Sequence, residues 1–456
     1  MIGKRVMAEE LFYTFRLEDH VPADHPLRSV DRLLDTGFVR RVMAPHYSSI
    51  GRPSIDPELM IRMLLVGYLH GIRSERRLCA EVHLNLAYRW FCRLGLDGAV
   101  PDHSTFSKNR HGRFRDSGVM RALFEQVVAL CSNAGLVPGE ELAVDGSHVS
   151  ANARTDRSVP GDASPEAWAG DRTELSRPVR EYLDALDAAL PPAPDEPRPG
   201  TPKYLSPTDP QAAWSTKHGS GGFAYEVNLL ADTAHGIIVD VETTPARLSQ
   251  EVVAAKAMIE RAKEQGRPAG LLAADGSYGT GPFLTWLVAR SVAPHIPVLD
   301  RIERNTTILS RNLFTYDAAE DSWTCPAGHA LRFAAFIEHQ GMRTYQGRPG
   351  TCGPCALKPS CTAGAYRQLS VSIHEPARQV ARELAETEAF ARSRRMRKKV
   401  EMLFAHLKEQ LGLRRLRLRG LKGAAEEFHL AAAVQNLRKL AHLTVHPASL
   451  EAKAAG

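Results

Sequence analysis

Three acidic residues, far apart in the chain, stand where carboxylates can do chemistry. Asp145 and Asp275 each follow an apolar run and precede a glycine, as expected where a buried strand delivers an acid to its carboxyl end. Glu401 lies in a basic stretch with helical periodicity. Two acids from strands and one from a helix can hold divalent metal ions together, and flanking cations suit phosphates. These residues predict a metal-dependent enzyme acting on DNA phosphodiesters.

Phosphodiester cleavage has a physical need for such a set. One metal ion activates water or a 3′ hydroxyl group while a second stabilises the leaving oxygen, and the two ions lie about 3.5–4 Å apart, so one carboxylate commonly bridges them. Hard oxygen ligands and substrate phosphates suit Mg²⁺. Taken singly, each Asp-Gly pair is better explained by a turn after a strand, and the Glu401 helix by a salt-bridged surface. The combination favours the catalytic interpretation.

Composition indicates a large protein with an ordinary core. The 456 residues are 43% hydrophobic and 24% charged, which allows two to four domains. The net charge of +6 permits nucleic-acid binding, and residues 392–422 are crowded with arginine and lysine. No apolar run approaches the roughly 20 residues that span a bilayer, and the N-terminus lacks the pattern of a signal peptide. We expect a cytoplasmic protein with no membrane partner.

Residues 1–140 predict a helical domain. Asp56 and Pro57 open one helix as N-cap and first helical residue. Further helices are expected over 74–82 and 86–94, and Asp102 could cap a short helix after them. That last helix would expose three polar residues: Ser107, Lys108 and Arg110. Such short helices suit a helix-turn-helix DNA reader, and a plain helical dimerisation module is equally consistent with the pattern.

Residues 141–309 and 376–445 predict a mixed sheet with helices packed on it. Strands are expected up to Asp145, with alternation that could extend beyond it, and up to Asp275. The other expected elements are a hairpin of 223–232 and 237–243, helices at 250–265, 282–289, 376–412 and 424–443, and a strand at 295–299. Residues 154–213, rich in Pro, Ala and Asp, predict a flexible surface insertion with one helix over 174–189.

The seven cysteines fall into two sets. Three are scattered in helical context and are expected to be inert core residues: Cys79, Cys92 and Cys131. Four are clustered in residues 310–375: Cys325, Cys352, Cys355 and Cys361. An odd total without an export signal argues against a disulfide framework. One CxxC pair, two single cysteines and His329 as a spare ligand fit structural zinc, while reduced, metal-free cysteines fit as well.

The chain resembles the DDE transposases of bacterial insertion sequences. The resemblance covers most of the chain and is carried by residues 144–148 with 151–153, 274–279 and the basic helix. That group's signature around its glutamate is Tyr, two residues, Arg, three residues, Glu, six residues, Lys. Arg397, Glu401 and Lys408 match it in register, while Arg394 occupies the tyrosine position.

The resemblance implies a fold and a set of roles. The fold would be α/β: a ribonuclease-H-like mixed sheet flanked by helices, with an all-α N-terminal domain and a small Cys-rich insertion. Asp145 would bridge two Mg²⁺ ions, Glu401 would complete one site and Asp275 the other, with Mn²⁺ as a substitute. His148, close to Asp145, would contact metal or DNA or be structural. Basic residues would hold the phosphate backbone: Arg394, Arg397, Lys408, Arg414, Arg415, Arg417 and Arg419.

The implied function is DNA transposition in a bacterial cytoplasm, at the nucleoid. The enzyme would bind the terminal inverted repeats of its element, cut the strand ends and join the freed 3′ ends to target DNA. Because both ends must be paired during transfer, a homodimer on double-stranded DNA is expected. Two alternatives stay open: a ribonuclease-H-like nuclease that only cuts, and a non-catalytic DNA-binding descendant of a transposase. Intact acids at all three positions count against the second alternative.

Overall fold

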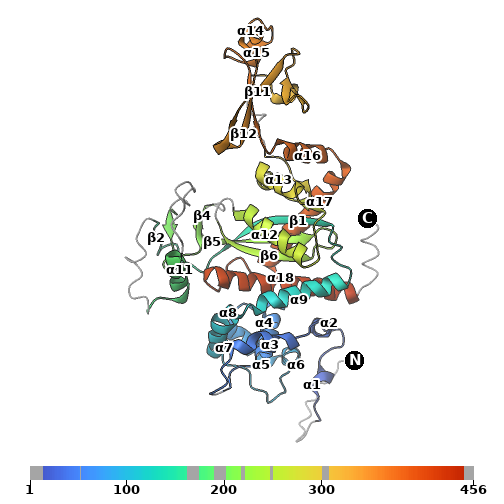
Figure 1. Ribbon diagram of the computed structural model, residues 1–456. Coiled ribbons are helices and arrows are strands. Elements are labelled where there is room, and N and C mark those ends of the chain that lie inside the picture. The colour runs from blue at the N-terminus through green and yellow to red at the C-terminus, as the bar shows by residue number, and fades with distance from the viewer. Residues whose placement is uncertain are drawn as a thin grey trace, which may run out of the picture.

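The computed structural model describes residues 14–51, 53–161, 174–188, 202–216, 221–246, 250–299 and 308–445. The N-terminal helices lie at the bottom of Figure 1, the mixed sheet in the middle and a small separate sheet at the top. No helix within these ranges is long and apolar enough to cross a membrane. Much of the proline-rich region predicted to be a flexible insertion, including 162–173 and 189–201, lies outside the described residues.

The N-terminal region is helical, as predicted. Its α-helices are α1 (Leu17–His20), α2 (Pro26–Leu33), α3 (Gly37–Met43), α4 (Pro57–Leu69), α5 (Glu75–Leu84), α6 (Leu86–Phe91), α7 (His103–Asn109), α8 (Arg115–Ser117) and α9 (Val119–Asn133). The predicted caps are present: Asp56 accepts the backbone N–H of Glu58, and Asp102 accepts that of Ser104, each at 2.9 Å. The predicted exposure of Arg110 is wrong, because its guanidinium is buried and donates to Glu75 at 3.0 Å.

The central sheet is mixed. Its strands are β1 (Glu141–Ser150), β4 (Ala213–Ser215), β5 (Gly222–Asp232), β6 (Ile238–Pro245), β7 (Leu271–Ala273) and β8 (Ala293–His295). β5 is antiparallel to its neighbours β1, β4 and β6, whereas β1, β7 and β8 are mutually parallel. The predicted hairpin is thus confirmed. The strand predicted over 295–299 instead ends at His295, since Pro297 has no N–H with which to continue a ladder.

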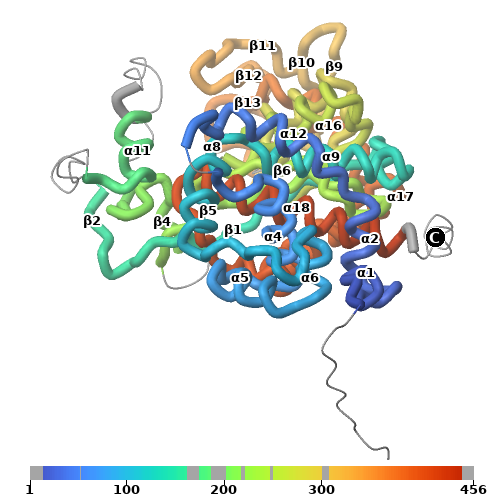
Figure 2. Tube along the Cα trace, turned by 90° about the horizontal axis from the view of Figure 1, so that it is seen from below, coloured from blue at the N-terminus to red at the C-terminus, as the bar shows by residue number. Residues whose placement is uncertain are grey.

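Helix α18 (Gly420–Val445) is the centre of the molecule. Along most of its length the residues are buried on every side, as expected for a helix enclosed by other elements. It packs against β6 on one side and against α9, α2 and α4 on another; Figure 2, seen from below, shows α4 lying over it. Asn436 on α18 is buried and pairs with both backbone groups of Ile238, accepting its N–H at 2.9 Å and donating to its carbonyl at 2.8 Å. The helix therefore closes the open edge of β6.

Other helices frame the sheet. They are α11 (Arg177–Ala188), α12 (Gln250–Glu264), α13 (Gly281–Val288), α16 (Glu375–Ala385) and α17 (Glu388–Glu409). The prediction of a single helix over 376–412 is wrong, because the helix is interrupted between α16 and α17. There the Thr387 side chain accepts the N–H of Phe390 at 3.2 Å and so caps a new helix. The helix predicted within the proline-rich region is confirmed by α11, which lies near the short strands β2 (Val159–Pro160) and β3 (Tyr204–Leu205).

The Cys-rich region builds its own antiparallel sheet, which the sequence analysis did not predict. Its strands are β9 (Thr315–Asp317), β10 (Ser322–Thr324), β11 (Ala330–Ile337), β12 (Met342–Gln346) and β13 (Gln368–Ser372), paired in the order β13-β12-β11-β10-β9. The short helices α14 (Pro349–Cys352) and α15 (Lys358–Cys361) separate β12 from β13. A small core of its own holds this unit together: Phe314, Leu331, Tyr345, Leu369 and Val371.

Candidate active site

The register of two parallel strands brings the first two acids to one edge. Glu141, Leu142 and Ala143 of β1 pair with Leu271, Leu272 and Ala273 of β7. If this pairing register is extended by two residues beyond Ala143 and Ala273, Asp145 lies opposite Asp275. Neighbouring strands of a sheet lie roughly 4.8 Å apart. β7 ends there, and Asp275 accepts the N–H of Ser277 at 2.8 Å to cap a turn. β1 instead continues to Ser150, as its alternating sequence allowed.

Arg397 connects the third acid to the first. On α17, its Nη2 lies 3.4 Å from Oε1 of Glu401, one helical turn away, and its Nη1 lies 3.7 Å from Oδ2 of Asp145. The guanidinium therefore stands between the strand acid and the helix acid. Glu401 itself is exposed, which leaves its carboxylate accessible from solvent.

The electrostatics of Asp145 show that the three carboxylates crowd one another. Burial raises the pKa of Asp145 to about 6, and the charges of Asp275 and Glu401 add to the rise; the N–H of Gly146 and the charge of Arg397 oppose it. Like charges held together in this way are stabilised by a bound cation. Oxygen-only donors of this kind fit Mg²⁺ or Mn²⁺. The donor types of this site suit a hard divalent ion, but among the described residues no group of three or more His, Cys, Asp or Glu side chains, these three acids included, is placed so that it could hold one.

Lys408 stands on the same face of the sheet as Asp145. Its Nζ donates to Oγ of Ser147 at 2.7 Å, and Ser147 shares a face with Asp145 because side chains alternate along a strand. Burial, followed by the charge of Arg414, lowers the pKa of Lys408. The matched signature residues Arg397 and Lys408 thus reach from α17 to β1, while Glu401 contacts Arg397 on the same helix.

His148 faces the other way. It lies on the opposite face of β1 from Asp145, and its Nε2 is 3.4 Å from Oε1 of the buried Glu226 on β5. This contact favours the structural interpretation of His148. Sequence reasoning missed Glu226, for which the signal was an acid inside an otherwise largely apolar strand. It also passed over Tyr278, whose pKa is raised well above its ordinary value by burial and then by Glu251 and Asp145.

The basic residues after α17 run alongside the end of β1. Ser150 donates to the carbonyl of Arg414 at 3.3 Å, and Leu416 donates to the carbonyl of Ser150 at 2.9 Å. Arg415 and Arg419 turn back onto the carbonyls of residues 153 and 152. The remaining predicted DNA contacts are exposed: Arg394, Arg414 and Arg417, of which Arg414 pairs with Glu409. The loop of residues 414–419 therefore pairs in parallel with the end of the strand that carries Asp145.

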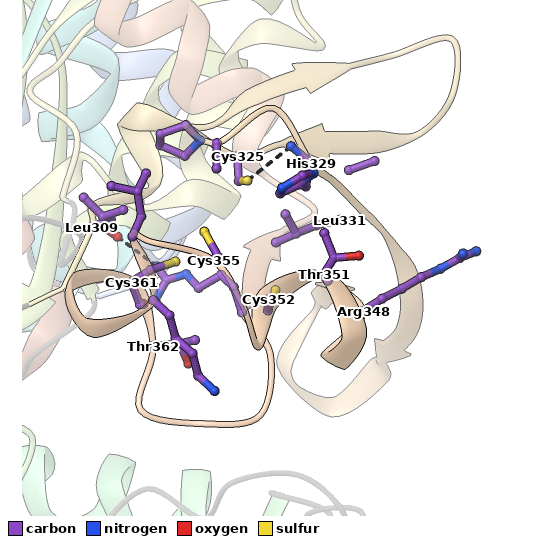
Figure 3. Close-up of a pocket in the computed structure, with 17 residues that line it drawn as sticks. Leu309, Cys325, His329, Leu331, Arg348, Thr351, Cys352, Cys355, Cys361 and Thr362 are labelled. Carbon is purple, nitrogen blue, oxygen red and sulfur yellow. Dashed lines mark hydrogen bonds between the residues drawn. The ribbon is translucent and has the colours of Figure 1, made fainter.

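The four clustered cysteines line one pocket together with His329 (Figure 3). All four are free thiols. Burial raises the pKa of Cys361, and the other three thiols add to the rise, which shows that the four sulfurs share one neighbourhood. Nevertheless, across the described ranges no group of three or more His, Cys, Asp or Glu side chains is placed so that it could hold a metal ion. The three scattered cysteines are buried, as predicted.

Fold and site together define a class: a mixed α/β protein whose acids and cations converge on one face, as in enzymes of nucleic-acid phosphodiesters. Two family models match the chain, the transposase domain DUF772 over residues 15–112 and a transposase DDE domain over 324–441. The chain therefore carries two transposase domains, and the second is a DDE domain, the catalytic domain of DNA transposition. The second match contains the four clustered cysteines and Glu401, whereas Asp145 and Asp275 lie outside both matched ranges. No curated protein matches the chain.

Proposed function

We propose that this transposase binds the terminal inverted repeats of an insertion sequence, cuts their strands and joins the 3′ ends to target DNA. Asp145, Asp275 and Glu401 are its catalytic carboxylates. The observation that carries this proposal is the Arg397 guanidinium set between Asp145 and Glu401, with Asp275 reached through the parallel register of β1 and β7. The mixed sheet, in which β5 opposes the direction of its neighbours, supports a ribonuclease-H-like catalytic domain.

The chemistry follows from the charges on this face. The three acids would hold Mg²⁺, or Mn²⁺ in its place, with Asp145 central because it neighbours both other acids. When bound, such ions supply an activated water or 3′ hydroxyl and stabilise the leaving oxygen. Arg397 holds Asp145 and Glu401 in position, and Lys408 binds the phosphate next to the cleaved bond. The exposed Arg394 and Arg414, with Arg415, Arg417 and Arg419, hold the flanking backbone.

Two alternative functions, a nuclease that only cuts and a non-catalytic DNA-binding protein, would give different experimental results. A nuclease that only cuts would fail to join pre-cut 3′ ends to a target duplex, whereas a transposase joins them. A non-catalytic DNA-binding protein would bind the ends without cutting them. A homodimer assembled on paired ends is part of the proposal, because both ends are transferred together.

Replacing Glu401 with glutamine tests the proposal on a single charge. We expect cleavage of duplexes bearing the inverted repeats that flank the gene to fall at least about 10³-fold, roughly 4 kcal/mol of barrier. DNA binding should persist, since Glu401 is an acid in a basic region. Glu388→Gln is the matched control, an exposed glutamate on the same helix. Equal cleavage by the two variants would remove Glu401 from the mechanism.

We further propose that the four clustered cysteines bind one structural Zn²⁺, with His329 as the alternative fourth ligand. The shared pocket and the mutual effect of the thiols support this proposal. Purified protein should contain one zinc per chain by atomic emission, and Cys355→Ser should lose it. Cys79→Ser, a change outside the cluster, should retain it. If the purified wild type contains no zinc and Cys355→Ser unfolds at the same temperature as the wild type, the cysteines are reduced and metal-free.

A further inference from the structure

A depression of about 500 Å³ lies where the N-terminal helices meet the basic loop after α17. Its lining comes from the loop before α5 and the start of α5, from α7 and the residues that follow it, and from the loop of residues 414–419. These residues are Ser74, Glu75, Arg76, His103, Ser104, Ser107, Lys108, His111 and Arg417. Two regions far apart in the sequence thus build one concave surface.

Cations dominate what this depression presents to solvent. Arg76, Lys108 and Arg417 are exposed. Neither the Lys108 ammonium nor the Arg417 guanidinium forms a hydrogen bond or ion pair with any residue that the structure describes. Among the same residues, the Arg76 guanidinium has one polar partner, Nε2 of His103 at 3.4 Å. The acid within the depression, Glu75, is already engaged by the buried Arg110 at 3.0 Å. Three long cations with these few protein contacts suit a polyanion.

A buried carboxylate fixes the two halves of the depression relative to each other. Oε1 of Glu427, on α18, accepts the backbone N–H groups of Arg417 and Leu418, each at 2.6 Å. Oε2 of the same side chain pairs with Arg73, just before α5, and accepts from Tyr68 at 3.4 Å. Glu427 is fully buried. One side chain therefore holds both the loop that carries Arg417 and the N-terminal helices that carry Arg76 and Lys108.

The depression lies along the direction of β1 from the catalytic acid. Ser150 pairs with Arg414 and Leu416, and the side chain of Asn152 donates to the carbonyl of Arg417 at 2.6 Å. Asn152 is seven residues beyond Asp145, which corresponds to about 23 Å of extended chain at roughly 3.3 Å per residue. B-form DNA covers that length in about seven base pairs.

We propose that Arg76, Lys108 and Arg417 form one composite site that binds the phosphate backbone of the duplex leading away from the active site, about seven base pairs from the cleaved bond. The site belongs jointly to the N-terminal and catalytic regions, so the DNA end bridges them. This inference rests on the proposed cleavage at Asp145, Asp275 and Glu401.

The test uses the full-length protein and duplexes that carry the flanking inverted repeats. Each of Arg76→Ala, Lys108→Ala and Arg417→Ala should weaken binding roughly fivefold at physiological salt and reduce the slope of log affinity against log salt by about 0.9. Hydroxyl-radical footprinting should show backbone protection about seven base pairs from the cut, lost in the triple variant while protection at the cut remains. Arg77→Ala, the adjacent exposed arginine outside the depression, is the matched control.

The outcomes separate this inference from the proposed function. If the wild type cleaves, Glu401→Gln does not, and the three variants bind and protect DNA like Arg77→Ala, the composite site is wrong and the catalytic assignment stands. If the wild type neither binds nor cleaves the duplexes, both proposals fall. Loss of the distal footprint together with the reduced salt slope supports the composite site.

Discussion

The substitution Asp145→Asn is expected to abolish DNA cleavage and, at the same time, to stabilise the metal-free protein near neutral pH. The loss of cleavage follows from the proposed role of Asp145 as the central carboxylate that would hold a divalent ion. We expect a fall of at least about 10³-fold. The gain in stability follows first from burial, since an uncharged amide at this position does not leave a charge removed from water, and then from the loss of repulsion by Asp275 and Glu401.

The direction of the pH effect comes from the proton affinity of Asp145. Its pKa rises from 3.8 to about 6 on folding, so the folded state binds this proton more tightly than the unfolded state does. Stability contributed by the protonated acid is therefore present below about pH 4 and is lost as the pH rises through 6. At 1.36 kcal/mol per pKa unit, the ionised acid costs about 3 kcal/mol above that range.

Denaturant unfolding with a chelator present measures this effect. Asp145→Asn should exceed the wild type in free energy of unfolding by up to about 3 kcal/mol at pH 7.5, with little difference near pH 4. Asp97→Asn, an exposed acid in the N-terminal region, should change stability at neither pH. An asparagine variant that is less stable than the wild type at pH 7.5 would show that Asp145 is not strained by its neighbours.

Removing the buried carboxylate of Glu427 should produce the largest loss of stability. Burial alone would raise its pKa, but Arg73, Arg110 and the N–H groups of residues 417 and 418 bring the pKa below its ordinary value, so the side chain is ionised. Glu427→Ala would leave Arg73 and Arg110 buried without this counter-charge and would release two N–H groups. We expect a cost of about 3–5 kcal/mol in the free energy of unfolding.

The neighbouring residue provides a strict control for that prediction. Glu426 is also buried on α18, and burial raises its pKa to about 8, so it is largely protonated at pH 7. Glu426→Gln should therefore not destabilise the protein at this pH, because a neutral acid is replaced by a neutral amide. A Glu427→Ala variant that loses less than about 1 kcal/mol would mean that the Arg73 pair is not what joins the two regions.

Several features could be predicted from local sequence because local physics determines them. Asp56 and Asp102 cap helices wherever their side chains can accept backbone N–H groups. The hairpin of β5 and β6 follows from two apolar runs joined by a short turn. The candidate acids were identified because two apolar runs that lead into Asp-Gly occur together with a glutamate in a basic helix. That Asp145 and Asp275 lie on neighbouring strands came from the parallel register of β1 and β7, which the sequence did not predict.

Other features depended on which partner each residue meets in the folded chain, whether near or far in the sequence. The burial of Arg110 against Glu75, with Glu427 nearby, overturned its predicted exposure. The placement of Arg397 between Asp145 and Glu401 required α17 to dock on β1. The break before α17 arose because Thr387 offered a cap in the middle of a helical pattern. Periodicity reports which face of an element is apolar, but not which partner covers it. The acids and their spacing were therefore set by the sequence alone, whereas the charges that surround them were decided by tertiary packing.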